Sequence, residues 1–250
     1  MKIKNLNKSY GEKHVVKQVD LQLPRGKVIS FIGPNGAGKS TVLNIITRLI
    51  AQDSGNVYFD DKELKQWKSK ELAKKMAILT QNINISMKLT VKELVSFGRF
   101  PYSGSNLTQE DYDMVKMAID YMELQEFENR FIDELSGGQL QRAYIAMVIA
   151  QDTEFIFFDE PTNNLDIYHA SNMMKLVRRL CDELGKTVIL VLHEINLASA
   201  YSDYIAAFKD GELYAFDTVD KVMTKENLKA LYNVDFDIQI LNGKPISLYY

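Results

Sequence analysis

A strand, a glycine-rich loop and a helix follow one another without interruption at residues 27–50, and this order restricts the fold more than any other part of the sequence. Residues 27–33 form a nearly continuous apolar run, as in a buried parallel strand, and residues 39–50 predict a helix. Between them, "GPNGAGKST" (33–41) matches G-x-x-x-x-G-K-[ST] at every fixed position. Such a loop directs backbone N–H groups at phosphates, its lysine reaches the terminal phosphates, and its hydroxyl binds Mg²⁺. The run therefore predicts a nucleotide-binding α/β fold that uses Lys39 and Ser40.

Along the rest of the chain, segments with the sequence pattern of helices alternate with segments that have the pattern of strands. Helices are predicted at residues 63–75, about 168–184 and near 219–232, and further strands at 19–23, 76–81, 154–161 and 185–194. An Asp-Gly pair inside 204–216 predicts a hairpin. Residues 91–131 predict a mostly helical insert with a loop at 98–106 and an apolar face of Met114, Met117 and Tyr121. The alternation predicts a mainly parallel sheet with helices on both faces.

Two acidic residues end the apolar run "FIFFDEP" (155–161). Ligands bind at the carboxyl ends of parallel strands, and adjacent carboxylates there need compensation. A magnesium–nucleotide complex would supply it, so we expect Asp159 to act on the magnesium side, through water, and Glu160 to polarise the attacking water. His193 follows the predicted strand at 187–192 and is expected at the same edge of the sheet.

A second helix start of this kind lies at "DELSGGQLQRAYIAMVIA" (133–150). Ser136 is a good N-cap, and the two glycines after it leave the backbone bare. Free N–H groups and the positive end of the helix dipole together favour an anion. Each of these motifs also has a purely structural interpretation: a plain glycine-rich turn, an acidic strand end, a packing histidine or an ordinary helix cap.

The amino-acid composition limits the kinds of molecule and environment that suit this chain. Apolar residues make up 46% and charged residues 25% of the chain, which is ordinary for a soluble globular protein. A net charge of −3 argues against nucleic acid as the main partner. The single cysteine, Cys181, excludes an internal disulfide and is expected to pack on a helix. Uninterrupted apolar stretches fall far short of the roughly 20 residues that span a bilayer, so a soluble, cytoplasmic chain is expected.

Taken together, the motifs resemble those of the ATP-binding cassette (ABC) ATPases, in the order of that family and over nearly the whole chain. They are "GPNGAGKST", Gln81 at the close of a strand, "LSGGQ" (135–139), "FIFFDEP", "TNNLD" (162–166) and "HE" (193–194). The resemblance implies one ABC ATPase domain, residues 1–250, of the P-loop NTPase fold. Its mainly parallel core sheet would carry helices on both faces, an N-terminal antiparallel β subdomain, and an inserted helical subdomain at about 82–140.

The resemblance also implies roles for single residues. The ATP-binding set would be Tyr10, stacked on the adenine, with Gly33, Pro34, Asn35, Gly36, Ala37, Gly38, Lys39, Ser40 and Thr41. The catalytic set would be Glu160, His193, Gln81 and Lys39, and the Mg²⁺ set Ser40, Gln81 and Asp159. Mg²⁺ is thus the implied cofactor, with ATP as the substrate.

In that family the signature sequence of one subunit closes over the nucleotide of another. The residues that would act on a neighbouring chain are Ser136, Gly137, Gly138 and Gln139, and Asp166 would link the two sites. Because one chain holds one copy of each motif, the resemblance implies a head-to-tail homodimer.

The segment "VSFGRFPYSG" (95–104) is similar to the corresponding part of importers for ferric siderophores, haem and cobalamin. It is most similar to the ATPases of iron–siderophore uptake in Gram-positive bacteria, with the catecholate class as one candidate. This implies separate integral membrane permease subunits docked on residues 82–100, a substrate-binding lipoprotein reached through them, and a place at the cytoplasmic face of the membrane.

Several alternatives remain open at this point. The chain could serve a haem, cobalamin or metal-ion importer, or be a non-transport ABC ATPase of the iron–sulfur-assembly type. It could also bind ATP without turnover, although the presence of Glu160, His193 and Gln81 argues against that. Residues 82–100 could be an ordinary solvent-facing helix.

Overall fold

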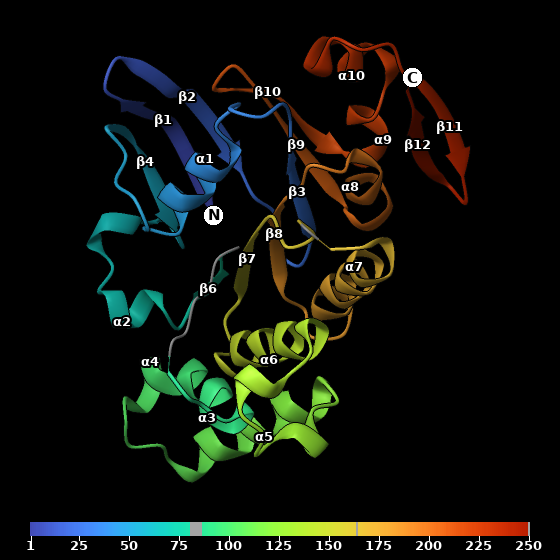
Figure 1. Ribbon diagram of the computed structural model, residues 1–250. Helices are drawn as coiled ribbons and strands as arrows, with labels where there is room; N and C mark the ends of the chain where they lie inside the picture. The colour runs from blue at the N-terminus through green and yellow to red at the C-terminus, as the bar shows by residue number, and fades with distance from the viewer. Residues whose placement is uncertain (81–86, 164, 250) are drawn as a thin grey trace. The chain divides into compact units, whose positions relative to one another are not determined.

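The computed structural model describes residues 1–80, 87–163 and 165–249. The chain forms two compact units, one from Met1–Trp67 with Phe157–Tyr250 and the other from Lys68–Ile156. Figure 1 labels the larger helices and strands of both units.

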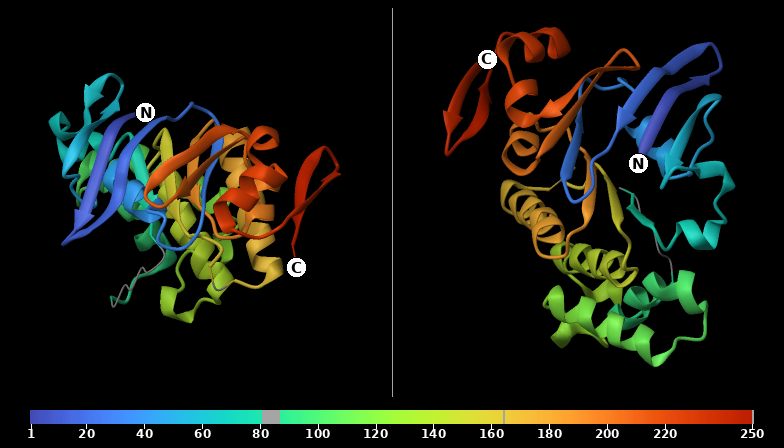
Figure 2. Two further views of the ribbon diagram at one scale, coloured as in Figure 1. Left: turned by 90° about the horizontal axis from the view of Figure 1, so that it is seen from above. Right: turned by 180° about the vertical axis from the view of Figure 1, so that it is seen from behind.

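The first unit begins with an antiparallel sheet in the strand order β2-β1-β4-β5. Its strands are β1 (Lys2–Tyr10), β2 (Lys13–Gln22), β4 (Ser54–Phe59) and β5 (Lys62–Glu63). Both views of Figure 2 show β1, β2 and β4 side by side. Alternate residues such as Ile3, Val19 and Val57 are buried, as the period of a half-exposed strand requires. The predicted antiparallel subdomain is therefore present.

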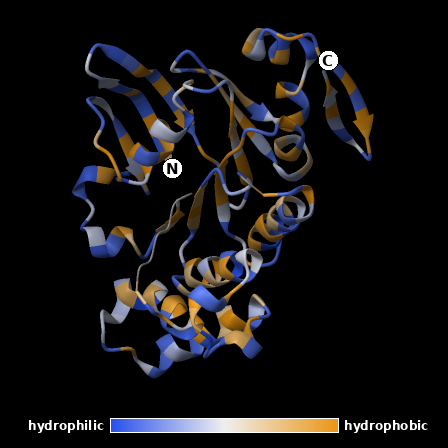
Figure 3. Ribbon diagram, in the orientation of Figure 1, coloured by the Kyte–Doolittle hydropathy of each residue, from blue (hydrophilic) through white to orange (hydrophobic). Residues whose placement is uncertain are grey.

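The core sheet of this unit has the strand order β10-β9-β3-β8-β7. The strands are β3 (Val28–Ile32), β7 (Phe155–Asp159), β8 (Thr187–Val191), β9 (Tyr204–Lys209) and β10 (Glu212–Thr218). β3 runs parallel to both β8 and β9, while β9 and β10 form the predicted Asp-Gly hairpin. β3 and β8 are buried along their whole length, and Figure 3 shows these central strands as hydrophobic. Parallel strands that are buried in this way need helices that cover both faces of the sheet.

Helices and a C-terminal hairpin complete the described part of this unit. They are α1 (Lys39–Ile46), η1 (Leu64–Gln66), α7 (Ile167–Asp182), α8 (Ile195–Tyr201), α9 (Val219–Val222) and α10 (Lys225–Tyr232), before β11 (Asp237–Leu241) and β12 (Lys244–Leu248). Cys181 is buried on α7, as predicted. The single helix predicted near 219–232 is wrong, because Thr224 starts a new helix by accepting a hydrogen bond from the Asn227 N–H at 3.2 Å.

The second unit is mostly helical. Its elements are α2 (Ser69–Leu72), β6 (Met76–Leu79), α3 (Val91–Ser96), η2 (Phe97–Arg99), α4 (Phe100–Ser103), α5 (Gln109–Tyr121), η3 (Gln125–Phe127), η4 (Ile132–Glu134) and α6 (Gly137–Ala150). Within this unit, the N–H of Phe155 donates to the carbonyl of Lys75, the residue before β6, at 3.1 Å. Over the residues that the structure describes, each helix is too short or too polar to span a lipid bilayer.

Two local predictions for this unit are wrong. The loop expected at 98–106 is present at 104–106, but residues 98–103 are helical in η2 and α4, where Pro101 occupies the first turn and its missing N–H removes no bond. The apolar face expected on α5 was Met114, Met117 and Tyr121, but Met117 is exposed and the buried row is Val115, Ala118 and Ile119. Both rows have helical spacing, and spacing does not determine which row meets a neighbouring helix.

Candidate functional site

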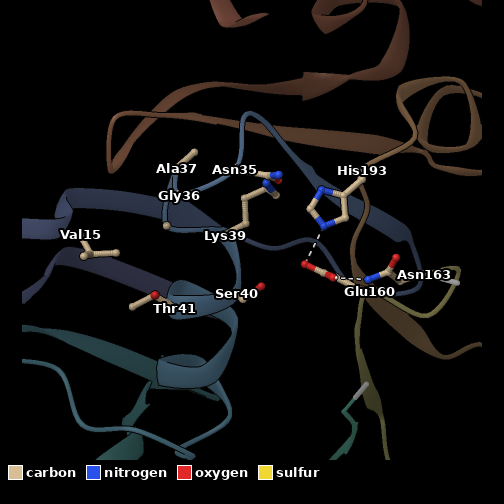
Figure 4. Close-up of a pocket in the computed structure, with 11 residues that line it drawn as sticks. Val15, Asn35, Gly36, Ala37, Lys39, Ser40, Thr41, Glu160, Asn163 and His193 are labelled. Carbon is tan, nitrogen blue, oxygen red and sulfur yellow. Dashed lines mark hydrogen bonds and ion pairs between the residues drawn. The ribbon is translucent and has the colours of Figure 1, made fainter. Parts of the chain in front are cut away.

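A cavity of about 580 Å³ lies over the start of α1 in the first unit. Figure 4 shows its lining, which comes from four segments far apart in the sequence. The lining residues are Val15, Asn35, Gly36, Ala37, Gly38, Lys39, Ser40, Thr41, Glu160, Asn163 and His193. The fold thus brings the predicted phosphate loop together with the side chains that follow β7 and β8.

Close packing holds the backbone of the loop in place. Gly38 precedes α1 with φ of +93°, in the left-handed region that favours glycine. A Cβ atom at Gly38 would lie 2.6 Å from the carbonyl oxygen of Val15 in β2. Only glycine therefore lets β2 pass directly over the loop, and that contact fixes where the first N–H groups of α1 point.

Lys39 is buried at the base of the loop. Its Nζ donates to the carbonyl oxygens of Gly33 at 2.7 Å and Pro34 at 3.0 Å. Burial lowers the pKa of Lys39, and the charges of Glu160 and Asp159 act in the opposite direction. A phosphate group would offer this ammonium a charged acceptor, and such bonds are stronger than those to neutral carbonyls.

Ser40 lines the cavity and contacts Asp159, because the Ser40 hydroxyl donates to Asp159 Oδ1 at 2.9 Å. Burial raises the pKa of the Asp159 carboxyl; the Ser40 bond opposes this rise, and the charge of Glu160 adds to it. A hydroxyl and a carboxylate are oxygen ligands of the kind that Mg²⁺ prefers. A divalent cation here would compensate the charge that burial disfavours, so this pair fits the implied metal.

The raised pKa of Asp159 leads to a stability prediction. The raised pKa means that the folded chain favours the protonated carboxyl of Asp159. The free energy of unfolding therefore falls as pH rises through the folded pKa and this carboxyl ionises. We expect Asp159→Asn to raise the unfolding midpoint of the nucleotide-free chain by about 2 °C near neutral pH. Differential scanning fluorimetry over a series from neutral pH downward should show the gain shrinking as pH falls toward the folded pKa of Asp159, which burial raises above its ordinary value. An unchanged or lower midpoint at the neutral end would contradict the assignment.

Glu160 is held from two sides by its neighbours. Its Oε1 lies 2.6 Å from His193 Nε2, and its Oε2 accepts from Asn163 Nδ2 at 3.1 Å; Figure 4 shows both contacts. Its backbone φ of +53° is left-handed, a strained conformation that clusters at functional sites in proteins. A carboxylate fixed in this way at a cavity wall can accept a proton from water.

Asn163 is a site residue that the sequence analysis left without a role. It lies three positions after Glu160, in a turn closed by the Asn163 N–H donating to the Glu160 carbonyl at 3.1 Å. The signals in the sequence were its place in "TNNLD" (162–166) and a short amide side chain at the closing position of a turn. Those signals indicate local geometry and say nothing of which side chain the amide will contact.

Other predicted residues lie elsewhere. Tyr10 ends β1, is half-exposed, and is not among the described residues that line the cavity. Asp166 is the N-cap of α7 and accepts from the His169 N–H at 2.8 Å, with His169 Nδ1 at 2.7 Å from the same oxygen. Gln81 lies outside the residues that the structure describes.

The second helix start has the predicted cap. Ser136 Oγ accepts from the Gln139 N–H at 3.3 Å, and Gln139 Oε1 accepts from the Ser136 N–H at 2.9 Å. This reciprocal capping box sets the first turn of α6 in the second unit. A Cβ atom at Gly137 would meet no described atom within 4 Å, so packing within the described chain does not require glycine there.

The chain is similar to a known protein family and to individual members of it. A family model described as ABC transporter matches residues 16–163. The petrobactin import ATP-binding protein YclP of Bacillus subtilis (strain 168) is 49% identical over 250 residues, covering 100% of this chain and 99% of its own length. The petrobactin import ATP-binding protein FatE of Bacillus anthracis is 45% identical over 251 residues, with 100% of both chains covered.

Solved structures show the same architecture. A dimeric, post-hydrolysis structure of the ATP-binding cassette MJ0796 with ADP and Pi matches with a TM-score of 0.74 and 35% identity, over 87% of this chain and 97% of that one. An inward-facing structure of a putative metal-chelate type transporter matches with a TM-score of 0.83 over 100% of this chain and 96% of that one. Its 23% identity supports the shared fold alone.

Proposed function

Because this chain belongs to the ABC transporter family, whose model matches residues 16–163, we propose that it is the ATP-hydrolysing subunit of an importer for a ferric siderophore. The observation that carries this proposal is its near full-length similarity to a petrobactin import ATP-binding protein, at 49% identity. An iron(3+)-hydroxamate import ATP-binding protein of Bacillus subtilis, at 39% identity over 96% of this chain, supports the same class of cargo.

The phosphate loop supplies binding energy for ATP. The N–H groups at the start of α1 point at the phosphates, and their dipole favours negative charge. Lys39 would exchange its two carbonyl acceptors for the terminal phosphates. Ser40 and Asp159 would hold Mg²⁺, with Gln81 as a further ligand, and the ion when bound neutralises phosphate charge.

Hydrolysis joins water to the γ-phosphate and releases ADP and phosphate. Glu160 would accept the proton of the attacking water, because its carboxylate faces the cavity and is already held by His193 and Asn163. A base that needs no reorientation lowers the barrier by proximity. His193 would in addition contact the γ-phosphate, and Tyr10 would stack on the adenine.

The signature residues would act on a second copy of the chain. Ser136, Gly137, Gly138 and Gln139 begin α6, where Gly137 leaves open space for a phosphate to approach the backbone. Near Asp166, Ile167 is 91% exposed at the start of α7 and Tyr168 is exposed beside it. Apolar groups in such a position favour burial by another chain. A head-to-tail pair would use both features, and MJ0796 is itself dimeric.

Permease subunits would dock on the second unit. Met87, Phe97 and Phe100 are exposed apolar side chains in or beside the predicted docking segment at 82–100; residues 82–86 of that segment lie outside the described residues. Several large exposed apolar side chains in one segment favour contact with another protein. Docking there would place the chain at the cytoplasmic face of the membrane and link it, through the permease, to a substrate-binding lipoprotein.

Uptake in cells tests the function and its alternatives together. Cells lacking this chain should lose most uptake of a labelled ferric siderophore, with ferric petrobactin as the first probe, and keep uptake of haem and cobalamin. The wild-type chain should restore uptake and the Glu160→Gln chain should not. Loss of haem or cobalamin uptake instead would identify that cargo. Unchanged uptake of all three, with the chain absent from membranes, would favour the iron–sulfur-assembly class.

A further inference from the structure

Residues 98–102 of the second unit, here named the anchor segment, are fastened to the C-terminal end of α6 at three points. A Cβ atom at Gly98 would lie 2.2 Å from the Met147 carbonyl oxygen, so the two backbones are in direct contact. Arg99 Nη1 donates to the Ala150 carbonyl at 2.8 Å. Further along, the Tyr102 hydroxyl donates to the Gln151 carbonyl at 3.1 Å. The bonds from Arg99 and Tyr102 occupy the Ala150 and Gln151 carbonyls, which a helix leaves unpaired at its end.

Arg99 is also the centre of a buried ionic cluster. It is 4% exposed, its partner Asp111 is 2% exposed, and Arg99 Nε donates to Asp111 Oδ1 at 2.8 Å. The guanidinium lies 3.8 Å from the centroid of the Tyr102 ring. Two donors in one plane and a stacked ring fix the orientation of an arginine, which a lysine could not reproduce.

Asp111 completes the cluster at the start of α5. It accepts hydrogen bonds from Ser103 Oγ, from the Thr108 N–H at 2.9 Å and from Thr108 Oγ1 at 2.8 Å. Burial alone would raise the pKa of Asp111, but the bonds from Ser103, Thr108 and Arg99 hold that pKa well below its usual range. The ion pair is therefore fully satisfied, and removing one partner of such a pair is strongly destabilising locally.

Two aromatic side chains beside these contacts are exposed. Phe97 immediately precedes the anchor segment and is 46% exposed, and Phe100 lies within it and is 60% exposed. The same short stretch therefore carries a fastened side, through Gly98, Arg99 and Tyr102, and an exposed aromatic side. α6 itself is a 14-residue helix, a rod of about 21 Å with Ser136 at its other end.

We propose that the anchor segment is a rigid link that ties the exposed aromatic residues Phe97 and Phe100 to α6, with Arg99 as its positioning residue. The inference deepens the proposed function and rests on it. When nucleotide draws the Ser136 end of α6 toward a second copy, the helix moves as a rod. The link passes that displacement to the docking side chains through the backbone contact of Gly98 and the hydrogen bonds of Arg99 and Tyr102.

Hydrogen exchange of the full chain tests the link without any permease. The Glu160→Gln chain is compared with and without Mg-ATP, and exchange is followed at residues 97–103 and 136–140. We expect ATP to slow both segments by about threefold or more. Adding Arg99→Met should keep the response at 136–140 and reduce the response at 97–103 to less than half. Arg130→Met, at an arginine stacked on Phe127 in the same unit, is the matched control and should preserve both responses.

A second variant tests the link separately, in case the Arg99→Met chain does not fold. Gly98→Ala keeps the Arg99–Asp111 pair but forces the backbones apart at Met147, and it should weaken the response at 97–103 in the same way. In cells, Arg99→Met should lower ferric siderophore uptake by about fivefold or more, while turnover by the isolated chain, measured per folded molecule below its unfolding midpoint, stays within about twofold. A purely structural role would lower both together.

The outcomes separate the two proposals. If ATP slows exchange at 136–140 but not at 97–103, or if Arg99→Met responds like the parent chain, the link is refuted and the proposed function stands. If ATP leaves 136–140 unchanged in the Glu160→Gln chain, nucleotide-driven closure is refuted, and the link falls with it.

Discussion

Replacing Glu160 with glutamine is expected to cut ATP turnover by about a hundredfold or more while ATP binding stays intact. Glutamine keeps the shape of the side chain and a hydrogen-bonding oxygen, but it cannot accept the proton of the attacking water. Binding depends instead on the phosphate loop, where Lys39 and Gly38 are untouched. Phosphate release under saturating ATP and titration with a fluorescent ATP analogue measure the two effects separately.

The same variant should accumulate as a nucleotide-bound dimer, because the step that opens the pair follows hydrolysis. Size-exclusion chromatography with and without ATP would show the shift. Glu226→Gln, at an exposed glutamate on α10 of the same unit, is the matched control and should behave as the wild type. Normal turnover by the Glu160→Gln chain would show that another group activates the water.

Ser136→Arg is expected to abolish turnover without weakening ATP binding to the monomer. The long cationic side chain would fill the space at the start of α6 that a neighbouring phosphate needs. Loss of the cap alone destabilises a helix by about 1 kcal/mol, too little to explain a complete loss. Thr90→Arg removes the equivalent capping box of α3 and is the control, with turnover expected within about twofold of wild type.

Mixing two inactive variants gives the sharpest form of this test. A head-to-tail pair of one Ser136→Arg chain and one Lys39→Ala chain would contain one site built entirely from intact parts and one built from two damaged parts. Random pairing makes half of the dimers mixed, so the mixture should recover up to about a quarter of wild-type turnover. Failure to recover activity while mixed dimers form would refute the shared site. Full activity of the wild-type chain as a monomer would refute it as well.

Local sequence was sufficient for the parts of the site that depend on backbone conformation. The run from β3 through Gly38 into α1 could be read locally, because its apolar strand must be buried and its glycines admit the left-handed dihedrals that the loop needs. The same reasoning located Asp159 and Glu160 at the end of β7, His193 after β8, and the capped start of α6 at Ser136. Each of these positions follows from a contiguous stretch and from the rule that parallel strands end at one edge of a sheet.

Contacts between distant segments were beyond that reasoning. The helical pattern of α5 fitted two rows equally well, and only packing against α3 and α6 selected Val115, Ala118 and Ile119 over the row with Met117. Residues 98–103 have the glycine, proline and serine of a loop, yet α6 supplies carbonyl groups that hold them in helical turns. The environments of Arg99 and Asn163 depend on the same kind of partner.

The sequence by itself therefore determined the chemistry that this chain carries, since its phosphate loop, strand-end acids and capped helix start are local motifs with local geometry. Only the tertiary structure decided which side chains hold Glu160 in place and how Arg99 is buried against α6. The physical reason is that a motif specifies its own backbone, whereas a buried ion pair or a backbone contact requires two segments whose meeting depends on the packing of the whole unit.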